Sequence, residues 1–188
     1  MESKISQSDS IILGIDPGTN IMGYGIISVK NRNISLLAMG AIHLSKLGDH
    51  TLRLKKIFEK TVHLIDEYKV DEVALEAPFY GKNVQSMLKL GRAQGVSMAA
   101  ALSRGIPVNE YLPKKVKKSI TGRGAASKEQ VSSMLKTIVP FQDTPKYLDA
   151  TDGLAIAVCH YFQRSSISSK SSYSSWDSFL KQNPDRKV

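Results

Sequence analysis

The segment IILGIDPG, residues 11–18, sets the architecture that this chain is expected to adopt. Its first five residues are apolar or glycine, which is the composition of a short strand buried inside a sheet. Asp16, Pro17 and Gly18 then give a turn signal, because these residue types favour the backbone conformations of tight turns. Asp16 is therefore predicted to stand at the carboxyl end of a buried strand.

The rest of the chain extends this strand into a mixed pattern. Two extended runs at 23–29 and 34–42, joined by a polar hairpin turn at 30–33, complete a β-meander. Helical and extended periodicities follow, with a helix at about 51–68, a buried strand at 73–76, a long helix at about 83–104, a strand at 107–110, helices near 113–119 and 127–138, and a last helix at about 148–162. This order predicts an α/β fold, a mixed five-stranded sheet with helices on both faces.

Composition divides the chain into one folded segment and two ends. Residues 1–10 are polar and predict a flexible leader, and residues 11–163 carry the periodic elements of one domain. Nine of the last 24 residues are serine, so residues 164–188 are predicted to form a disordered tail. The chain shows no signal peptide and no run of the roughly 18 apolar residues that a membrane helix needs. Together with a single cysteine, Cys159, these features predict a cytoplasmic protein.

Positive charge is concentrated in the middle of the chain. The formal net charge is +9, and residues 77–148 hold 12 Lys or Arg against 3 Asp or Glu, which is also a net +9. A basic block of this kind favours nucleic acid as a partner, with an ordinary solvated surface as the alternative. The block contains the cluster Lys114, Lys115, Lys117 and Lys118, followed by Arg123 and Lys128. Such cations contact phosphates and give affinity with little base information.

Four acidic residues stand at the ends of apolar elements. Asp16 and Glu76 each end a predicted buried strand, and parallel strands would bring both carboxylates to one edge of the sheet. Asp149 and Asp152 are three residues apart at the start of the last helix, so they share one face. Converging carboxylates repel one another unless cations neutralise them, and hard oxygen ligands suit Mg²⁺ or Mn²⁺. Taken singly, each acid could instead be a turn residue, a solvent-exposed strand end or a helix-dipole partner.

These motifs together resemble those of a known family. Gly14-Ile15-Asp16-Pro17-Gly18 followed by Gly23-Tyr24-Gly25 resembles the opening of the RuvC Holliday-junction resolvases. Their second acidic motif is similar to residues 76–79 with 88–96, their basic segment to residues 116–118 with 122–131, and their closing acidic motif to residues 149–157. The resemblance covers residues 11–163 in order.

The resemblance implies a ribonuclease H-like fold and a homodimer that nicks four-way DNA junctions in recombination and repair. It implies that Asp16, Glu76, Asp149 and Asp152 bind Mg²⁺, with two ions per active site during catalysis and Mn²⁺ as a substitute. Lys117 and Lys128 match DNA-contacting lysines, and Lys114, Lys118 and Arg123 are expected to add phosphate contacts. A RuvA–RuvB branch-migration complex is a further partner expected from the resemblance.

Phe79 matches an aromatic residue in the loop after the second acid. An exposed ring there could stack on an unpaired base of an opened junction, while core packing is the alternative role.

Two other readings of the sequence and one ambiguous motif stay open. A non-catalytic basic DNA-binding module would use only the middle segment, and it leaves the four acids unexplained. An actin-like or sugar-kinase domain shares the Asp-x-Gly-Thr turn of residues 16–19, but it needs two such domains and a second phosphate loop, for which this chain is too short. Gly91 and Gly95, four residues apart in the long helix, permit close approach either to the chain's own sheet or to a second copy.

Overall fold

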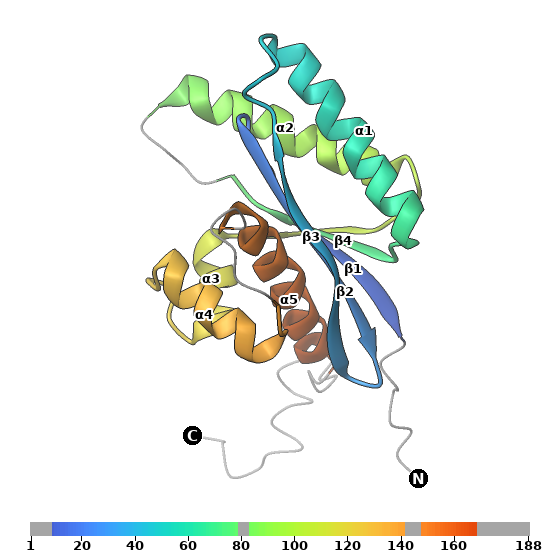
Figure 1. Cartoon of the computed structure of the whole chain (residues 1–188), viewed down its shortest axis with the longest axis vertical. Helices are drawn as coiled ribbons and strands as arrows, with labels where there is room; N and C mark the ends of the chain where they lie inside the picture. The colour runs from blue at the N-terminus through green and yellow to red at the C-terminus, as the bar shows by residue number, and fades with distance from the viewer. Residues whose placement is uncertain (1–8, 79–82, 142–147, 169–188) are drawn as a thin grey trace, which may run out of the picture.

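The computed structural model describes residues 9–78, 83–141 and 148–168 of the chain (Figure 1). Within these residues, five strands form one sheet in the spatial order β3-β2-β1-β4-β5, and five helices cover it. The elements are β1 Ser10–Asp16, β2 Ile21–Lys30, β3 Asn33–His43, α1 His50–Tyr68, β4 Glu72–Glu76, α2 Val84–Leu102, β5 Val108–Tyr111, α3 Pro113–Thr121, α4 Lys128–Ile138 and α5 Leu148–Ser168.

Strand β1 lies at the centre of the sheet, as its apolar sequence predicted. Ile12, Leu13 and Ile15 are fully buried. On one side β1 pairs antiparallel with β2, which pairs antiparallel with β3, and on the other it pairs parallel with β4, which pairs parallel with β5. The predicted mixed α/β sheet is therefore confirmed, and the carboxyl ends of β1, β4 and β5 meet at one edge.

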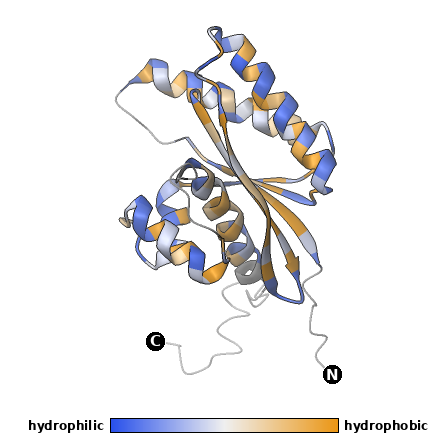
Figure 2. Cartoon of the chain, viewed as in Figure 1, coloured by the Kyte–Doolittle hydropathy of each residue, from blue (hydrophilic) through white to orange (hydrophobic). Residues whose placement is uncertain are grey.

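The helices lie on both faces of the sheet, so the molecule has three layers (Figure 1). Helices α1 and α2 pack on one face over a core that includes Leu13, Ile15 and Leu75, and α5 packs on the other with α3 and α4 beside it. In Figure 2 hydrophobic and hydrophilic residues alternate around α1, as expected for a helix with one face toward a sheet. No helix in the described part of the chain is long and apolar enough to cross a membrane.

Turns and caps explain where several elements begin and end. Asn31 and Arg32 both have positive φ, 49° and 67°, which is the conformation of a tight two-residue hairpin between β2 and β3. Asn83 caps α2, as the sequence indicated, by accepting from the backbone N–H of Ser86 at 3.0 Å. Ser127 and Gln130 form a capping box that starts α4 at Lys128.

Helix α5 extends further than the sequence predicted. It runs to Ser168 rather than about residue 162, and so enters the segment predicted as tail. Arg164 holds this end of the helix in place, because its guanidinium donates to Ser10 Oγ at 2.8 Å and to the carboxylate of Glu72. The remaining residues of the predicted leader and tail, 1–8 and 169–188, lie outside the described residues, as does Phe79.

Helix α5 lies directly on the backbone of β1 and β2. A Cβ atom added to Gly14 would come within 2.2 Å of the carbonyl oxygen of Gly153, and one added to Gly25 within 2.4 Å of Leu154 Cα. The contact is reciprocal, because a Cβ added to Gly153 would come within 2.4 Å of Tyr24 Cα. Only glycine at these positions lets the helix and the sheet approach this closely.

This packing predicts a large effect of a single methyl group. Gly14→Ala should force α5 away from the sheet and lower the free energy of unfolding by about 1–3 kcal/mol, as overpacking does. Gly48→Ala is the matched control, since a Cβ there meets nothing within 4 Å, and it should change stability by less than about 0.5 kcal/mol. Urea unfolding of both variants checks the prediction, and equal stabilities would contradict it.

Candidate active site

Asp16 and Glu76 stand side by side at the carboxyl edge of the sheet. Asp16 is the last residue of β1 and Glu76 the last residue of β4, and the preceding residues, Ile15 and Leu75, are partners in the parallel ladder. The predicted convergence of these two strand ends is therefore observed.

The start of α5 brings the other two acids to the same edge. Gly23 pairs with Asp16 across the β1–β2 ladder, and a Cβ added to Gly23 would lie 2.0 Å from the carbonyl oxygen of Asp149. The first turn of α5 thus sits on the backbone next to Asp16. Asp152, one turn further along, keeps 21% of its side-chain surface exposed.

A cavity of about 240 Å³ is lined by acids and lysines from five elements. We call it the acidic cavity. Its wall contains Asp16 from β1, Glu76 from β4, Asp152 from α5, and Lys117 and Lys128 from α3 and α4. Asp149 is not part of the wall, but its negative charge contributes to raising the pKa values of Asp16 and Lys128.

Burial and neighbouring negative charges make the carboxyls of Asp16 and Glu76 weaker acids than usual. Burial, followed by the negative charge of Asp152, raises the pKa of Asp16 to about 6, although the Lys128 charge opposes the rise. Burial and then the charges of Asp16 and Asp152 raise the pKa of Glu76 to about 8. The folded chain therefore disfavours the charged form of both carboxyls, mainly through burial.

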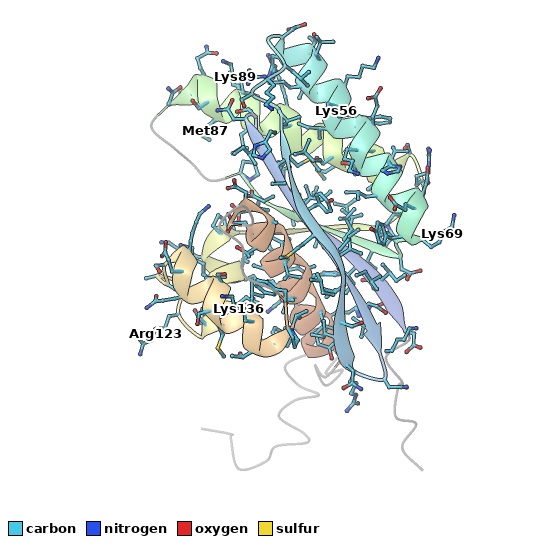
Figure 3. The ribbon with its side chains drawn as sticks, in the orientation of Figure 1. Lys56, Lys69, Met87, Lys89, Arg123 and Lys136 are labelled. Atoms are coloured by element: carbon cyan, nitrogen blue, oxygen red, sulfur yellow. The ribbon has the colours of Figure 1, made fainter. Side chains whose placement is uncertain are left out.

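Lys128 is the lysine of the cavity wall that pairs with one of the acids. Its Nζ donates to Asp152 Oδ2 at 2.6 Å, and this hydrogen bond raises the pKa of Lys128. Lys117 donates to the carbonyl oxygen of Ala126 at 2.8 Å, which fixes its ammonium beside the α3–α4 connection. Lys114, Lys118 and Arg123 are exposed and do not line the cavity, and Figure 3 shows Arg123 at the outer end of the α3–α4 pair.

The carboxylate oxygens of the acidic cavity are the type of ligand that a hard divalent cation prefers. Acidic residues from three elements line one cavity, and a cation bound there would stabilise the charged forms that burial disfavours in Asp16 and Glu76. With Lys128 bound to Asp152, no three His, Cys, Asp or Glu side chains among the described residues are arranged as a ready-made metal site. Metal binding would therefore require these side chains, Lys128 included, to move.

The structure adds one residue that the sequence did not single out. Arg53 of α1 donates to the carbonyl oxygen of Thr19 at 3.0 Å and to Asn20 Oδ1 at 2.8 Å, so it holds the turn that follows Asp16. An arginine on an amphipathic helix is typical of a solvent-facing position, and only the fold shows that this one reaches back across the chain.

Comparison with known proteins agrees with this architecture. The family described as "Crossover junction endodeoxyribonuclease RuvC" matches residues 12–160. Curated relatives with that description include those of Cytophaga hutchinsonii, 59% identical over 95% of this chain and 88% of the relative, and Bacteroides fragilis, 55% identical over 95% and 96%. The chain also superposes on Thermus thermophilus RuvC in complex with Holliday junction substrate, with a TM-score of 0.76, 30% identity, and coverage of 82% of this chain and 94% of that one.

The raised carboxyl pKa values predict a pH-dependent stability in the absence of divalent ions. A carboxyl with a higher pKa in the folded chain binds its proton more tightly there, so folding loses stability as the pH rises between the two values. For Glu76 this window extends from 4.5 to about 8. The Tm in EDTA should fall across it, and it should fall less in Glu76→Gln. Parallel pH profiles for the two proteins would contradict the assignment.

Proposed function

The chain belongs to the RuvC family and is a crossover junction endodeoxyribonuclease, and we propose that Asp16, Glu76, Asp149 and Asp152 form its metal-dependent catalytic site on four-way DNA junctions. The observation that carries this proposal is the acidic cavity, where carboxylates from β1, β4 and α5 face lysines from α3 and α4. A protein that only binds DNA would not benefit from buried carboxylates at its phosphate-binding surface.

The four acids would hold Mg²⁺, or Mn²⁺ in its place, with two ions during catalysis. The chemistry that such ions supply is activation of a water molecule and stabilisation of the leaving oxygen. The protein supplies the geometry, because Asp16 and Glu76 end neighbouring strands, and Asp149 and Asp152 stand near the start of α5, which packs on β1 and β2. The nucleophile and the scissile phosphate would thus meet at a rigid sheet edge.

The lysines would hold the phosphate beside the acids. Lys117 and Lys128 line the same cavity, so a phosphate bound there can contact both ammonium groups. A phosphate would draw Lys128 away from Asp152 and leave that carboxylate for metal. Lys114, Lys118 and Arg123 lie further out and would extend the contact along the DNA backbone, which gives affinity and register.

Substitution of each acid tests the catalytic site. Asp16→Asn, Glu76→Gln, Asp149→Asn and Asp152→Asn should each lower Mg²⁺-dependent cleavage of a synthetic four-way junction by at least about a hundredfold, while junction binding survives. Asp149 is the most informative position, since it stands outside the cavity wall. Glu59→Gln, on the exposed surface of α1, is the control and should cut at the normal rate. An acid variant with near-normal cleavage would exclude that residue from the site.

We further propose that two copies assemble through the outer face of α2. Val84, Leu88 and Leu102 on this helix are 66%, 52% and 60% exposed. Gly91 and Gly95 lie on the same stripe, and a Cβ added to either meets no atom within 4 Å. The glycines thus make no close contact with the chain's own sheet, and they would permit the close approach of a second copy. A twofold dimer would present two equivalent sites, one for each strand that a junction resolvase must cut.

The dimer proposal predicts a selective effect of a charge on α2. Leu88→Lys should weaken self-association by at least about tenfold, because a leucine at an interface contributes more than 1 kcal/mol. Leu52→Lys on α1 is the matched control, since Leu52 is equally exposed at 51% and lies off the stripe. Sedimentation velocity of both variants, free and on the junction, decides the question. A wild-type chain that is monomeric in both conditions would refute the dimer.

A further inference from the structure

Asp16 and Glu76 line a second cavity as well as the acidic one. This cavity has a volume of about 110 Å³, and its described wall is completed by residues of the loops after β1 and β4 and by Leu90 and Gln94 of α2. Helices α2 and α3–α5 cover opposite faces of the sheet (Figure 1), and the two cavities share Asp16 and Glu76 in their walls. We call the smaller one the α2 cavity.

The two cavities differ in the chemistry of their walls. The acidic cavity contains Lys117 and Lys128, whereas the described wall of the α2 cavity contains no Lys or Arg. Besides Asp16 and Glu76, its described wall contains the apolar residues Pro17, Ala77, Pro78 and Leu90, together with Gln94. A phosphate needs cations or N–H donors, so it suits the acidic cavity. Apolar walls with one amide suit a sugar ring or the edge of a base, and the volume is too small for a whole nucleotide.

Gln94 is the polar group that could read a base. Its side chain is 6% exposed, although it belongs to a helix whose outer face is open to solvent. Its Nε2 donates to the carboxylate of Glu110 on β5. Because a carboxylate accepts and does not donate, this bond fixes the amide with its nitrogen toward Glu110 and its oxygen away from it. The amide therefore presents one defined hydrogen-bonding face.

We propose that the α2 cavity receives the sugar and base edge of a nucleotide next to the scissile phosphate, and that Gln94, oriented by Glu110, selects that base. The inference rests on the proposed function, since it places the scissile phosphate at the shared carboxylates. A glutamine amide offers an acceptor beside a donor, which matches N6 and N7 of adenine, whereas the corresponding edge of guanine carries two acceptors. The chemical class recognised is a nucleobase with adjacent donor and acceptor atoms.

Cleavage of a set of junctions tests this inference. Each junction carries one of the four bases at either nucleotide flanking the cleaved bond, and single-turnover rates are measured with Mg²⁺. The wild type should prefer some bases, and in Gln94→Met the ratio of fastest to slowest rate should fall by roughly fivefold or more, because a base-reading amide contributes about that much discrimination. Gln85→Met is the matched control, an exposed glutamine on the same helix, and it should keep the wild-type ratio.

Each other outcome overturns the inference. An unchanged ratio in Gln94→Met would show that its amide reads no base, and an equal loss of rate on every junction would make it only a supporting residue. If Gln94→Met does not fold, the variant Glu110→Gln is measured in its place. An amide at position 110 can face Gln94 with either its oxygen or its nitrogen, so it no longer fixes the orientation of the Gln94 amide. Glu110→Gln should then also lower the ratio of fastest to slowest rate. A wild type that cuts none of the junctions refutes the proposed function itself, whereas an unchanged ratio with normal cutting refutes this inference alone.

Discussion

Gly14 and Gly25 lie opposite each other on neighbouring strands, and the backbone of α5 lies directly against both. Gly153 completes the contact from the helix side. This close approach fixes the height of α5 above the sheet, and with it the distance from Asp149 and Asp152 to Asp16. A larger residue at any of these glycines would move the acids of α5 away from those of the strands. The geometry of the site therefore depends on backbone packing several residues away.

The opposite end of α5 is fixed by a buried polar network. Tyr111 Oη lies 2.7 Å from His160 Nδ1, and His160 Nε2 lies 2.8 Å from Glu72 Oε2. Arg164 also reaches Glu72 and continues the network toward β1. These contacts connect α5 to the start of β4 and the end of β5. The helix is thus held at both ends, which allows it to carry two carboxylates into a region of like charge without being repelled from the sheet.

Buried carboxyls of like charge distinguish this site from an ordinary polar surface. Burial is the main cause that raises the pKa values of Asp16 and Glu76, and the charge of Asp152 raises both further. Lys128 relieves part of this charge through Asp152. A fold that keeps such a cluster uses it for something other than stability. The acidic residues Asp16 and Glu76 thus line two chemically different cavities, one with lysines in its wall and one with apolar residues.

Part of this arrangement could be predicted from local sequence patterns. Asp16 and Glu76 end buried strands, and parallel strands share an edge, so their convergence required only the identification of the strands. The common face of Asp149 and Asp152 follows from helical spacing. The hairpin at Asn31 and the cap at Asn83 likewise follow from local residue preferences. The extra residues of α5 up to Ser168 were not predicted, because they depend on the contact of Arg164 with Glu72, which is 92 residues away.

Other features were decided only by the tertiary structure. The sequence shows a cluster of cations from Lys114 to Lys128, and the tilt of α3 and α4 against α5 determines that Lys117 and Lys128 reach the acidic cavity. The sequence also leaves open which side of α2 carries Gly91 and Gly95, and the packing places them outward. The orientation of Gln94 by Glu110 joins a helix to a strand and has no local signal. Helix faces and strand ends follow from the periodicity and the turn residues of the local sequence. Which neighbouring element a side chain reaches depends instead on how whole elements pack against one another.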